Sequence, residues 1–537
     1  MDSVIEYGSL AIYAAVASLL VRGCIIFIYR KWFRQGIVWD SALHYAVIHT
    51  LKQNGRYSGV PAFLMQEEPD SYPIAFHRLA SLLPLDWIKR YQYLPSLGIF
   101  AVSFAGFVMY VHYIEKNLLL TQEHNLVVWA AAFYLVSVSN LVFNANAILY
   151  ISLSERLLAQ LSCSWFFLLL AVGVGFGDKL SLALAVFVGA LVGISSIFGR
   201  QTVTFTTPLV ALFLFDGTPL LVLAAAFVGA LLLDRGYFLR GLRHMVTLAQ
   251  AYNRHTKRSA FIQPALSRFV NWRRVFGRGI ALQARLNELA TGEPTRLLLQ
   301  HPNIILFVSV FLIWPVLAAP PLFAIVLATL AVYLLTSTKL FNHFGEAARY
   351  IEFNLALGVP FFLALYAVKI VSPELNHLLI PAYFCSVGLL TLWFYYQWQC
   401  FPCPKHDELA TFLAPLGLRD KDTVFPIPFT LGGSIWMRAP ACRVLMYQGA
   451  AVTPSLYEKF VEDVPLLKKN WWPLFEEYGV TYVIGLTVIT KQLRNIVGWD
   501  YDYTQLRKVA ESDYYVAYAV PAVAQPAPIA VDEVSAP

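Results

Sequence analysis

Charged residues are scarce in this chain of 537 residues, since Asp, Glu, Lys and Arg together make up only 14% of it. Soluble domains carry roughly a quarter, so an ordinary water-soluble protein is excluded. Hydrophobic residues instead make up 58%, with a mean hydropathy of +0.58. Long apolar runs, such as residues 95–112, 182–197 and 304–319, approach the roughly 20 residues that a helix needs to cross a bilayer. The composition predicts a polytopic α-helical membrane protein.

Cysteine is also scarce, with six residues that lie far apart in the chain except for Cys400 and Cys403. No second close pair and no histidine cluster in the sequence completes a zinc site. Two alternatives stay open near the end of the chain. One is a disulfide among Cys400, Cys403 and Cys442, which requires an extracytoplasmic location, and the other is free thiols.

Features of a cleavable signal sequence are scarce, because no basic stretch precedes the first apolar run at about residues 7–28 and no small-residue cleavage site follows it. This run is expected to remain as a helix. A strong charge of one sign is lacking too, since the net charge is +7. Basic residues beside spans usually reflect membrane orientation and lipid headgroups. Membrane lipids are therefore expected partners, and nucleic acid is not.

The number of spans depends on the stretch from Thr206 to Leu233, which can form one long helix or two short ones broken at Asp216-Gly217-Thr218-Pro219. With one helix, the basic segment at residues 235–301 would be cytoplasmic, as the positive-inside rule prefers. With two helices it lies on the side of the first loop, although the rule weakens for loops beyond about 60 residues. In the two-helix case, eleven spans are expected within residues 1–400, near residues 7–28, 94–114, 126–143, 159–175, 180–197, 201–216, 218–234, 303–319, 321–337, 352–371 and 377–398.

The segments outside the spans differ in character. Residues 235–301 carry apolar and basic residues at amphipathic spacing, and they are expected to form helices on the membrane surface. In residues 401–520, short strand-like runs alternate with helical stretches, which predicts a small extracytoplasmic α/β domain. Residues 521–537 are rich in Pro and Ala and are expected to be disordered.

The first inter-span loop, residues 30–93, is far longer than its neighbours and carries a distinctive set of polar residues. Asp40 and His44 are spaced i, i+4, so they share one face of a helix that is expected to end at Asn54-Gly55. Asp40 lies in the first turn of that helix, where a carboxylate is favoured. It can therefore act as a helix cap or as a catalytic group.

Two further polar groups lie in the same loop. Glu67, Glu68 and Asp70 form an acidic cluster that can hold a divalent cation, which is the one cofactor considered, or can simply be solvated. His77 and Arg78 can line a donor site or anchor a surface helix.

The order of these residues resembles a known family. Asp-x-x-x-His-Tyr at Asp40, then Gly55-Arg56, then Tyr-Pro-x-x-Phe-His-x-Leu-x-x-Leu from Tyr72 resemble the first external loop of GT-C superfamily glycosyltransferases. Members of that superfamily are multi-span enzymes that take a sugar from a polyprenyl phosphate donor. Their first external loop carries a catalytic acid close after the first span. The resemblance implies that Asp40 is this residue.

Shorter elements fit the same resemblance. Ser154-Glu155-Arg156 begins a span, and Gly199-Arg200-Gln201-Thr202 lies between two spans. Residues 345–350 are similar to an acidic-x-x-Arg-aromatic element that some GT-C families place at the active site, although a strict His-Lys-Glu form is lacking. Residues 477–483 resemble the soluble domain of many bacterial members. The likeness implies a bacterial plasma membrane location, with the active site and the C-terminal domain extracytoplasmic.

The sidedness of these elements bears on the span count. Two helices between Thr206 and Leu233 put the polar groups of the resemblance on one side of the membrane, namely Asp40, Arg200, Glu346, Arg349 and the C-terminal domain. One helix would leave Glu346 and Arg349 on the side opposite Asp40. Eleven spans are therefore preferred over ten.

Sugar transfer from a lipid phosphate needs a base for the acceptor hydroxyl and cations for the leaving phosphate. Asp40 is the expected base. Arg200 and Arg349 are the expected phosphate ligands, because a guanidinium can bind phosphate through two hydrogen bonds. For each arginine a headgroup contact or an ion pair stays open, such as a pair between Glu346 and Arg349.

The sequence thus predicts an inverting glycosyltransferase with an extracytoplasmic glycan, lipid or protein acceptor, where inversion is implied by the resemblance. Two other classes stay open: a transporter or flippase of lipid-linked glycans, and a glycan polymerase or ligase that uses lipid diphosphate donors. The residues expected to bind substrate are His44, His77, Arg78, Arg200, Glu346 and Arg349.

Overall fold

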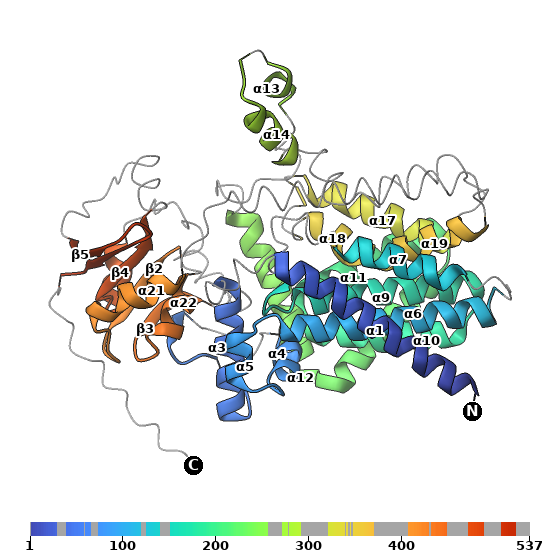
Figure 1. The fold of residues 1–537 in the computed structure, drawn as a ribbon, viewed down its shortest axis with the longest axis horizontal. Coiled ribbons are helices and arrows are strands. Elements are labelled where there is room, and N and C mark those ends of the chain that lie inside the picture. Colours follow the sequence, from blue (N-terminus) through green and yellow to red (C-terminus); the bar gives the residue numbers. More distant parts are fainter. Residues whose placement is uncertain are drawn as a thin grey trace.

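The computed structural model describes residues 2–28, 39–57, 59–65, 73–119, 125–139, 151–255, 271–277, 279–291, 320–338, 340–341, 344, 347–369, 406–428, 431–447, 471–487 and 506–521. They form a bundle of apolar helices, a mixed α/β domain and a group of short elements that lies between the two (Figure 1).

Apolar helices build the bundle. Five of the described helices are long and apolar enough to cross a membrane, and the pair α18 and α19, bent by 51°, makes a sixth if it forms one span. A polytopic helical membrane protein is thus confirmed, and eleven remains the predicted number of spans. The helices are α1 (Asp2–Ile28), α6 (Leu94–Asn117), α7 (Asn125–Ser139), α9 (Arg156–Phe176), α10 (Lys179–Ser195), α11 (Ile197–Leu214), α12 (Thr218–His255), α17 (Pro320–Thr336), α18 (Ala347–Asn354) and α19 (Gly358–Lys369). Every expected span coincides with one of them except residues 303–319 and 377–398, which lie outside the described residues.

Small residues let α10 and α12 approach closely. A Cβ added at Gly189 of α10 would lie 2.8 Å from the Cβ of Ala226 on α12, and one added at Gly193 would lie 3.0 Å from the Cβ of Ala230. Because lipid tails are as apolar as leucine, helices in a membrane associate through such close backbone packing. A larger side chain at either glycine would push the two helices apart.

The chain reverses between α11 and α12. Phe215 adopts a left-handed conformation with φ +52°. Asp216 Oδ1 accepts hydrogen bonds of 2.8 Å from the backbone N–H and from the hydroxyl of Thr218. These bonds cap the start of α12. The two-helix alternative for residues 206–233 is therefore confirmed.

The last part of α12 extends past the expected span. Asp234 leaves helical geometry (φ −156°, ψ 82°), and its Oδ1 accepts a 3.0 Å hydrogen bond from the N–H of Tyr237, so the helix restarts in a new direction. Tyr237 and His244 are buried, so this amphipathic part packs on the bundle. Within the described residues 271–277 and 279–291, Gly279 (φ +78°) lies between two short helices, α13 (Trp272–Phe276) and α14 (Leu282–Thr291).

The first loop forms the short elements between the bundle and the α/β domain (Figure 1). Its main helix begins at Trp39 and ends at Asn54, as expected. Gly55 follows with φ +69°, a conformation that glycine adopts without strain. The elements are α3 (Trp39–Asn54), β1 (Phe63–Met65), α4 (Ala75–Ala80) and α5 (Leu85–Arg90).

A six-stranded mixed sheet in the order β1-β3-β2-β4-β6-β5 forms the α/β domain. The pairs β1–β3, β3–β2 and β2–β4 are parallel, and β6 runs antiparallel to both β4 and β5. The predicted α/β domain is confirmed. Its own elements are α21 (His406–Leu413), a short 3-10 turn (Ala414–Leu416), β2 (Thr423–Ile427), α22 (Leu431–Arg438), β3 (Arg443–Tyr447), α24 (Trp472–Tyr478), β4 (Tyr482–Leu486), β5 (Arg507–Glu511) and β6 (Tyr515–Ala519).

The first loop supplies one edge strand of this sheet, which the sequence did not indicate. Phe63 pairs with Val444 and Met65 with Tyr447, and the carbonyl of Ala62 accepts a 2.8 Å hydrogen bond from the N–H of Val444. The pairing is parallel, so a segment near the start of the chain completes a sheet formed near its end. The domain limits at residues 401–520 remain a prediction, but the sheet extends beyond them.

A common apolar core joins the first loop to the α/β domain. Buried residues of α3, α4, α22 and the strands pack together, among them Val47, Phe76, Ile435 and Ile484. The backbones come closest at Gly433 of α22, where an added Cβ would lie 3.1 Å from the Cβ of Ala42 and 3.1 Å from the backbone nitrogen of Leu43. The helix that carries Asp40 and His44 is therefore packed directly against the C-terminal domain.

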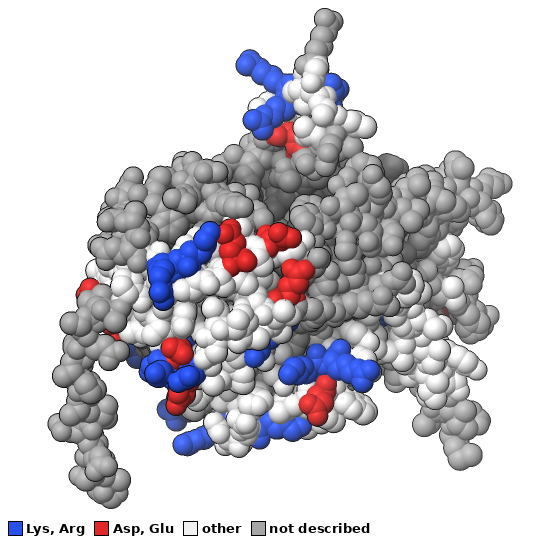
Figure 2. All heavy atoms as spheres, turned by 60° about the vertical axis from the view of Figure 1, so that its left-hand side comes forward, with Lys and Arg blue, Asp and Glu red and all other residues white. Residues whose placement is uncertain are grey.

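Charged side chains of both signs lie on the outer face of the α/β domain. Figure 2 shows Lys and Arg interspersed with Asp and Glu across the described part of that face. A mixed, charged surface of this kind is typical of a domain in contact with water. The bundle is the apolar part of the molecule, and the domain is the hydrated part.

The described cysteine of this domain does not form a disulfide. Cys442 is a buried free thiol, and burial raises the pKa of that thiol to about 12. Cys400 and Cys403 lie outside the described residues. Of the two alternatives, a disulfide that includes Cys442 is therefore wrong for this structure.

Candidate active site

Three helices begin at the same end of the bundle. α9 and α11 begin there because α10 returns the chain between them. α18 runs alongside α9 in the same direction, since Nε2 of Gln160 donates to the carbonyl of Glu352 (3.1 Å) and the hydroxyl of Ser164 donates to the carbonyl of Asn354 (3.4 Å). Helix N-termini present free N–H groups and a partial positive charge. This end of the bundle therefore favours an anionic ligand.

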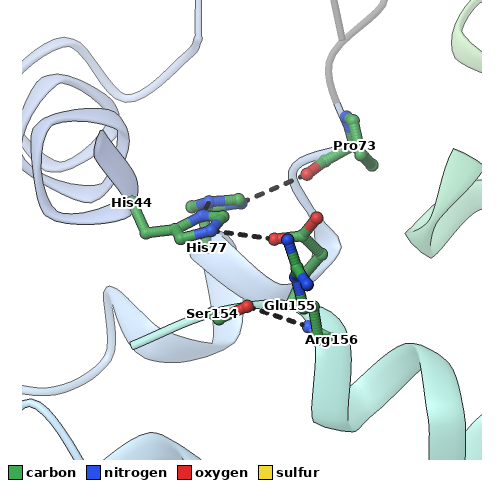
Figure 3. Close-up of polar contacts among 6 residues, drawn as sticks. All are labelled: His44, Pro73, His77, Ser154, Glu155 and Arg156. Carbon is green, nitrogen blue, oxygen red and sulfur yellow. Dashed lines mark hydrogen bonds and ion pairs between the residues drawn. The ribbon is translucent and has the colours of Figure 1, made fainter. Parts of the chain in front are cut away.

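Two histidines of the first loop and one glutamate of the bundle meet at this end, and we refer to them as the His44–His77–Glu155 cluster (Figure 3). Nε2 of His44 lies 3.0 Å from Oε2 of Glu155. Nδ1 of His44 lies 2.9 Å from Nε2 of His77. Nδ1 of His77 lies 3.1 Å from the carbonyl oxygen of Pro73. The cluster ties α3, α4 and the start of α9 together.

The hydrogen-bonding partners of the two histidines indicate which of their ring nitrogens carry protons. A carbonyl oxygen only accepts, so Nδ1 of His77 must donate to Pro73. Burial, followed by the charge of His44, holds the pKa of His77 well below its usual value, so this ring is neutral and its Nε2 accepts. His44 must then donate from Nδ1. Its Nε2 lies beside the carboxylate of Glu155.

The same geometry bears on metal binding. Three of the four ring nitrogens of His44 and His77 take part in hydrogen bonds, and the fourth, Nε2 of His44, lies 3.0 Å from Glu155. Among the described residues, no group of three or more His, Cys, Asp or Glu is placed to hold a metal ion. The acidic cluster of Glu67, Glu68 and Asp70 lies outside the described residues.

Asp40 lies in the first turn of α3, as expected. Its side chain lies outside the described residues, but the i, i+4 spacing on a helix places it one turn before His44. Arg78, on the last turn of α4, is exposed, whereas the neighbouring His77 is fully buried. Of the loop residues expected to bind substrate, the structure thus joins His44 with His77 and leaves Arg78 toward solvent.

Arg200 is fully buried in the first turn of α11. Its Nε and Nη2 donate to the carbonyl of Gly193 at 2.9 and 2.6 Å, and its guanidinium lies over the ring of Tyr237, 5.7 Å from the centroid. A Cβ at Gly241 would collide with the same guanidinium. Arg200 therefore joins α10, α11 and α12, and its role as a phosphate ligand remains a prediction.

Arg349 lies on the first turn of α18. Its guanidinium covers the ring of Phe198, 3.7 Å from the centroid, a cation–π contact between α18 and the first turn of α11. Glu346, the residue expected to pair with it, lies outside the described residues. Arg200 and Arg349 therefore both belong to the end of the bundle where the helices begin.

Glu155 is the site residue that sequence reasoning did not assign. In the sequence, Ser154-Glu155-Arg156 is only one short element of the resemblance, with no role assigned to its glutamate. In the structure Glu155 makes no side-chain capping bond and contacts His44 instead. Tyr237 and His244, which surround Arg200, were also missed. The two residues are spaced i, i+7 on one face of α12. This spacing of polar residues on an amphipathic helix is the sequence signal that could have identified them.

Comparison with known proteins finds similarity in structure only. No family model and no curated protein matches this sequence. Solved structures with a similar fold include the oligosaccharyltransferase of Archaeoglobus fulgidus in complex with zinc and sulfate, at 11% identity and a TM-score of 0.49, over 94% of this chain and 73% of that one. ArnT of Cupriavidus metallidurans bound to undecaprenyl phosphate has 12% identity and a TM-score of 0.48, over 98% and 99%.

A third structure, the oligosaccharyltransferase AglB of Archaeoglobus fulgidus with an inhibitory peptide and a dolichol phosphate, has 13% identity and a TM-score of 0.48, over 89% of this chain and 69% of that one. These proteins are GT-C glycosyltransferases, the superfamily that the first loop resembles. At TM-scores below 0.5 the likeness is one of general arrangement. It assigns no activity, donor or acceptor to this chain.

Proposed function

We propose that this chain is an inverting membrane glycosyltransferase, which moves a sugar from a polyprenyl-phosphate donor to a glycan, lipid or protein acceptor on the extracytoplasmic side. One observation carries the proposal. The contact between His44 and Glu155 attaches the helix bearing Asp40 to the end of the bundle where α9, α11 and α18 begin. A carboxylate and an anion-favouring region are thus held together, as this reaction requires.

The reaction proceeds by a single displacement. Asp40 takes the proton of the acceptor hydroxyl, and the acceptor oxygen forms a bond to the anomeric carbon. The bond between that carbon and the phosphate oxygen breaks, and polyprenyl phosphate leaves with the electron pair. Arg349, Arg200 and the helix N-termini stabilise the negative charge that grows on the phosphate.

The alternative of a lipid-diphosphate donor is distinguished by what is consumed, and a flippase is distinguished by the absence of a new glycosidic bond. In purified protein reconstituted with a labelled polyprenyl-phosphate sugar, the proposal expects label in an acceptor fraction together with free polyprenyl phosphate. Transport of the intact donor, or turnover of undecaprenyl diphosphate sugars alone, would contradict it.

Asp40→Asn tests the central residue. Loss of a general base lowers the transfer rate by about 10²–10⁴-fold. Asp216→Asn is the matched control, because Asp216 caps α12 at the other end of the bundle and asparagine caps nearly as well. We expect that control to retain transfer. An Asp40→Asn variant that transfers at the rate of the unmodified chain would refute the assignment of Asp40.

A further inference from the structure

A broken helix carries one of the two arginines proposed to bind the donor phosphate. α18 has only eight residues, and α19 follows it at an angle of 51°. Arg349 lies on the first turn of α18, and the break begins after Asn354. At 1.5 Å per residue, about 7.5 Å of helix separates the two. A helix this short is marginal by itself, so the place of Arg349 depends on what holds α18.

One serine of α9 bridges the break. In a continuous helix the carbonyl of Asn354 would accept from the N–H of Gly358, and the N–H of Leu357 would also donate within the helix. Here the hydroxyl of Ser164 donates to the carbonyl of Asn354 (3.4 Å) and accepts from the N–H of Leu357 (2.7 Å). A side chain that enters the ladder of hydrogen bonds bends a helix sharply. Backbone groups freed inside a membrane require such a partner.

Asn354 attaches the same break to two more helices. Its Nδ2 donates to the hydroxyl of Thr206 on α11 (3.0 Å) and to the hydroxyl of Thr329 on α17 (2.9 Å), and all three side chains are buried. Two residues earlier, Nε2 of Gln160 on α9 donates to the carbonyl of Glu352 (3.1 Å). The last turn of α18 is therefore bonded to α9, α11 and α17.

The first turn of α18 contacts α11 through Arg349 itself. The guanidinium lies over the ring of Phe198, 3.7 Å from the centroid. The bond from Asn354 to Thr206 joins the same two helices deeper in the bundle. The two contacts therefore set the distance between α18 and α11 at both ends of the short helix.

We propose that Ser164 and Asn354 are positioning residues of the active site, which fix the break between α18 and α19 so that Arg349 is held where the donor phosphate binds. This inference rests on the proposed function, because it assigns a role in the same transfer reaction. Over about 7.5 Å of helix, a bend of 51° moves the first turn by roughly 6 Å relative to a straight continuation of α19. A displacement of that size would take Arg349 away from Phe198.

Ser164→Ala tests the bridge, because it removes the hydroxyl that bonds both freed backbone groups. We expect the KM for the donor to rise by about tenfold, since a displaced guanidinium loses hydrogen bonds to the phosphate. The KM for the acceptor should stay within about twofold. Loss of folded protein alone lowers the rate per milligram and leaves both KM values unchanged, so the KM for the donor separates positioning from general damage.

A milder variant combines Thr206→Val with Thr329→Val. Valine has nearly the shape of threonine but offers no acceptor to Asn354. We expect the KM for the donor to rise by about threefold. If Ser164→Ala does not fold, this pair decides the question.

Ser181→Ala is the matched control. Ser181 is a buried serine whose hydroxyl also contacts two polar side chains, Tyr110 (2.6 Å) and Asp178. It lies in the first turn of α10, which begins where α9 ends, so it is at the end of the bundle away from Arg349. We expect this variant to keep a KM for the donor within about twofold of that of the unmodified chain.

A double variant tests whether Ser164 acts through Arg349. Arg349→Gln alone should raise the KM for the donor by about tenfold or more. With that change present, Ser164→Ala should raise it by less than about twofold further, because the group that it positions is gone. Full additivity of the two changes overturns the proposal, and so does a folded Ser164→Ala variant whose KM for the donor is unchanged.

The outcome is separable from that of the proposed function. An unmodified chain that forms no glycosidic bond from any polyprenyl-phosphate sugar refutes the proposed function, and this inference with it. If the unmodified chain transfers sugar and Arg349→Gln raises the KM for the donor, but neither Ser164→Ala nor the threonine pair does, the function stands and the positioning role is refuted. An active chain in which Arg349→Gln leaves that KM unchanged also refutes the positioning role.

Discussion

His77 is a buried histidine whose neutral form suits both of its hydrogen-bonding partners. The carbonyl of Pro73 accepts from Nδ1, and His44 donates to Nε2, so the neutral ring satisfies both neighbours. A second proton on His77 would remove the acceptor that His44 needs. Because burial holds the pKa of His77 well below its usual value, the ring stays neutral and keeps the acceptor that His44 needs.

This property predicts a pH dependence of stability. His77 has a folded pKa well below its model value of 6.5, so below that pH the unfolded chain takes up a proton that the folded chain refuses. Stability is then lost as pH falls, by up to about 1.4 kcal/mol per pH unit. In His77→Gln, whose amide oxygen can accept from His44, thermal unfolding in detergent should vary less between pH 8 and pH 5.

Arg78→Gln, an exposed change on the same helix, is the control and should keep the acid sensitivity of the unmodified chain. An equal loss of stability on acidification in the His77→Gln variant would show that His77 is not responsible.

Elements were more readily predicted than contacts. Apolar runs of sufficient length identify spans because lipid requires every backbone group to be bonded within a helix, and the break at Asp216 was visible because turn residues interrupt the run. The three residues of β1 have no such signal, since a strand this short has no readable period. Glu155 had no assigned role in the sequence, and Arg200 was expected to bind a phosphate or a lipid headgroup. Only the structure shows that His44 lies beside Glu155 and that the carbonyl of Gly193 accepts hydrogen bonds from Arg200.

The contact between α22 and α3 predicts a size-dependent effect on activity. Gly433→Ala puts a Cβ 3.1 Å from Ala42 and from the backbone of Leu43, and forcing such contacts costs about 1–3 kcal/mol. Because these residues lie between Asp40 and His44, we expect transfer to fall by about tenfold or more, as misplacement of a catalytic group by fractions of an ångström does.

Ala42→Gly removes one of the close contacts, the one with the Cβ of Ala42, so the double variant should recover part of the transfer rate. Gly98→Ala is the matched control, because a Cβ at that helical glycine meets nothing within 4 Å. Full activity of Gly433→Ala would show that α3 moves freely against the domain.

At the scale of the whole molecule, the antiparallel course of α9 to α12 predicts which parts face the same compartment. The turn at Phe215, which is 94% exposed, lies at the end of the bundle opposite the His44–His77–Glu155 cluster. In a chain whose native cysteines other than buried Cys163 and Cys442 are replaced by serine, we expect Lys421→Cys to react with a membrane-impermeant thiol reagent on intact cells. Phe215→Cys should react only after permeabilisation.

Labelling of both positions in intact cells would contradict the two-helix course between residues 206 and 233. Reaction of Phe215→Cys alone would keep that course and reverse the proposed orientation, so that the active site would face the cytoplasm.

The strand that the first loop adds to the C-terminal sheet also sets an order of events during synthesis. About 380 residues separate β1 from its partner β3, and at about 5–20 residues per second the ribosome needs tens of seconds to make them. During this interval β1 has no partner and α3 lacks the helix that packs against it. Until β3 and α22 have been synthesised, the chain therefore has its loop residues but not their final arrangement.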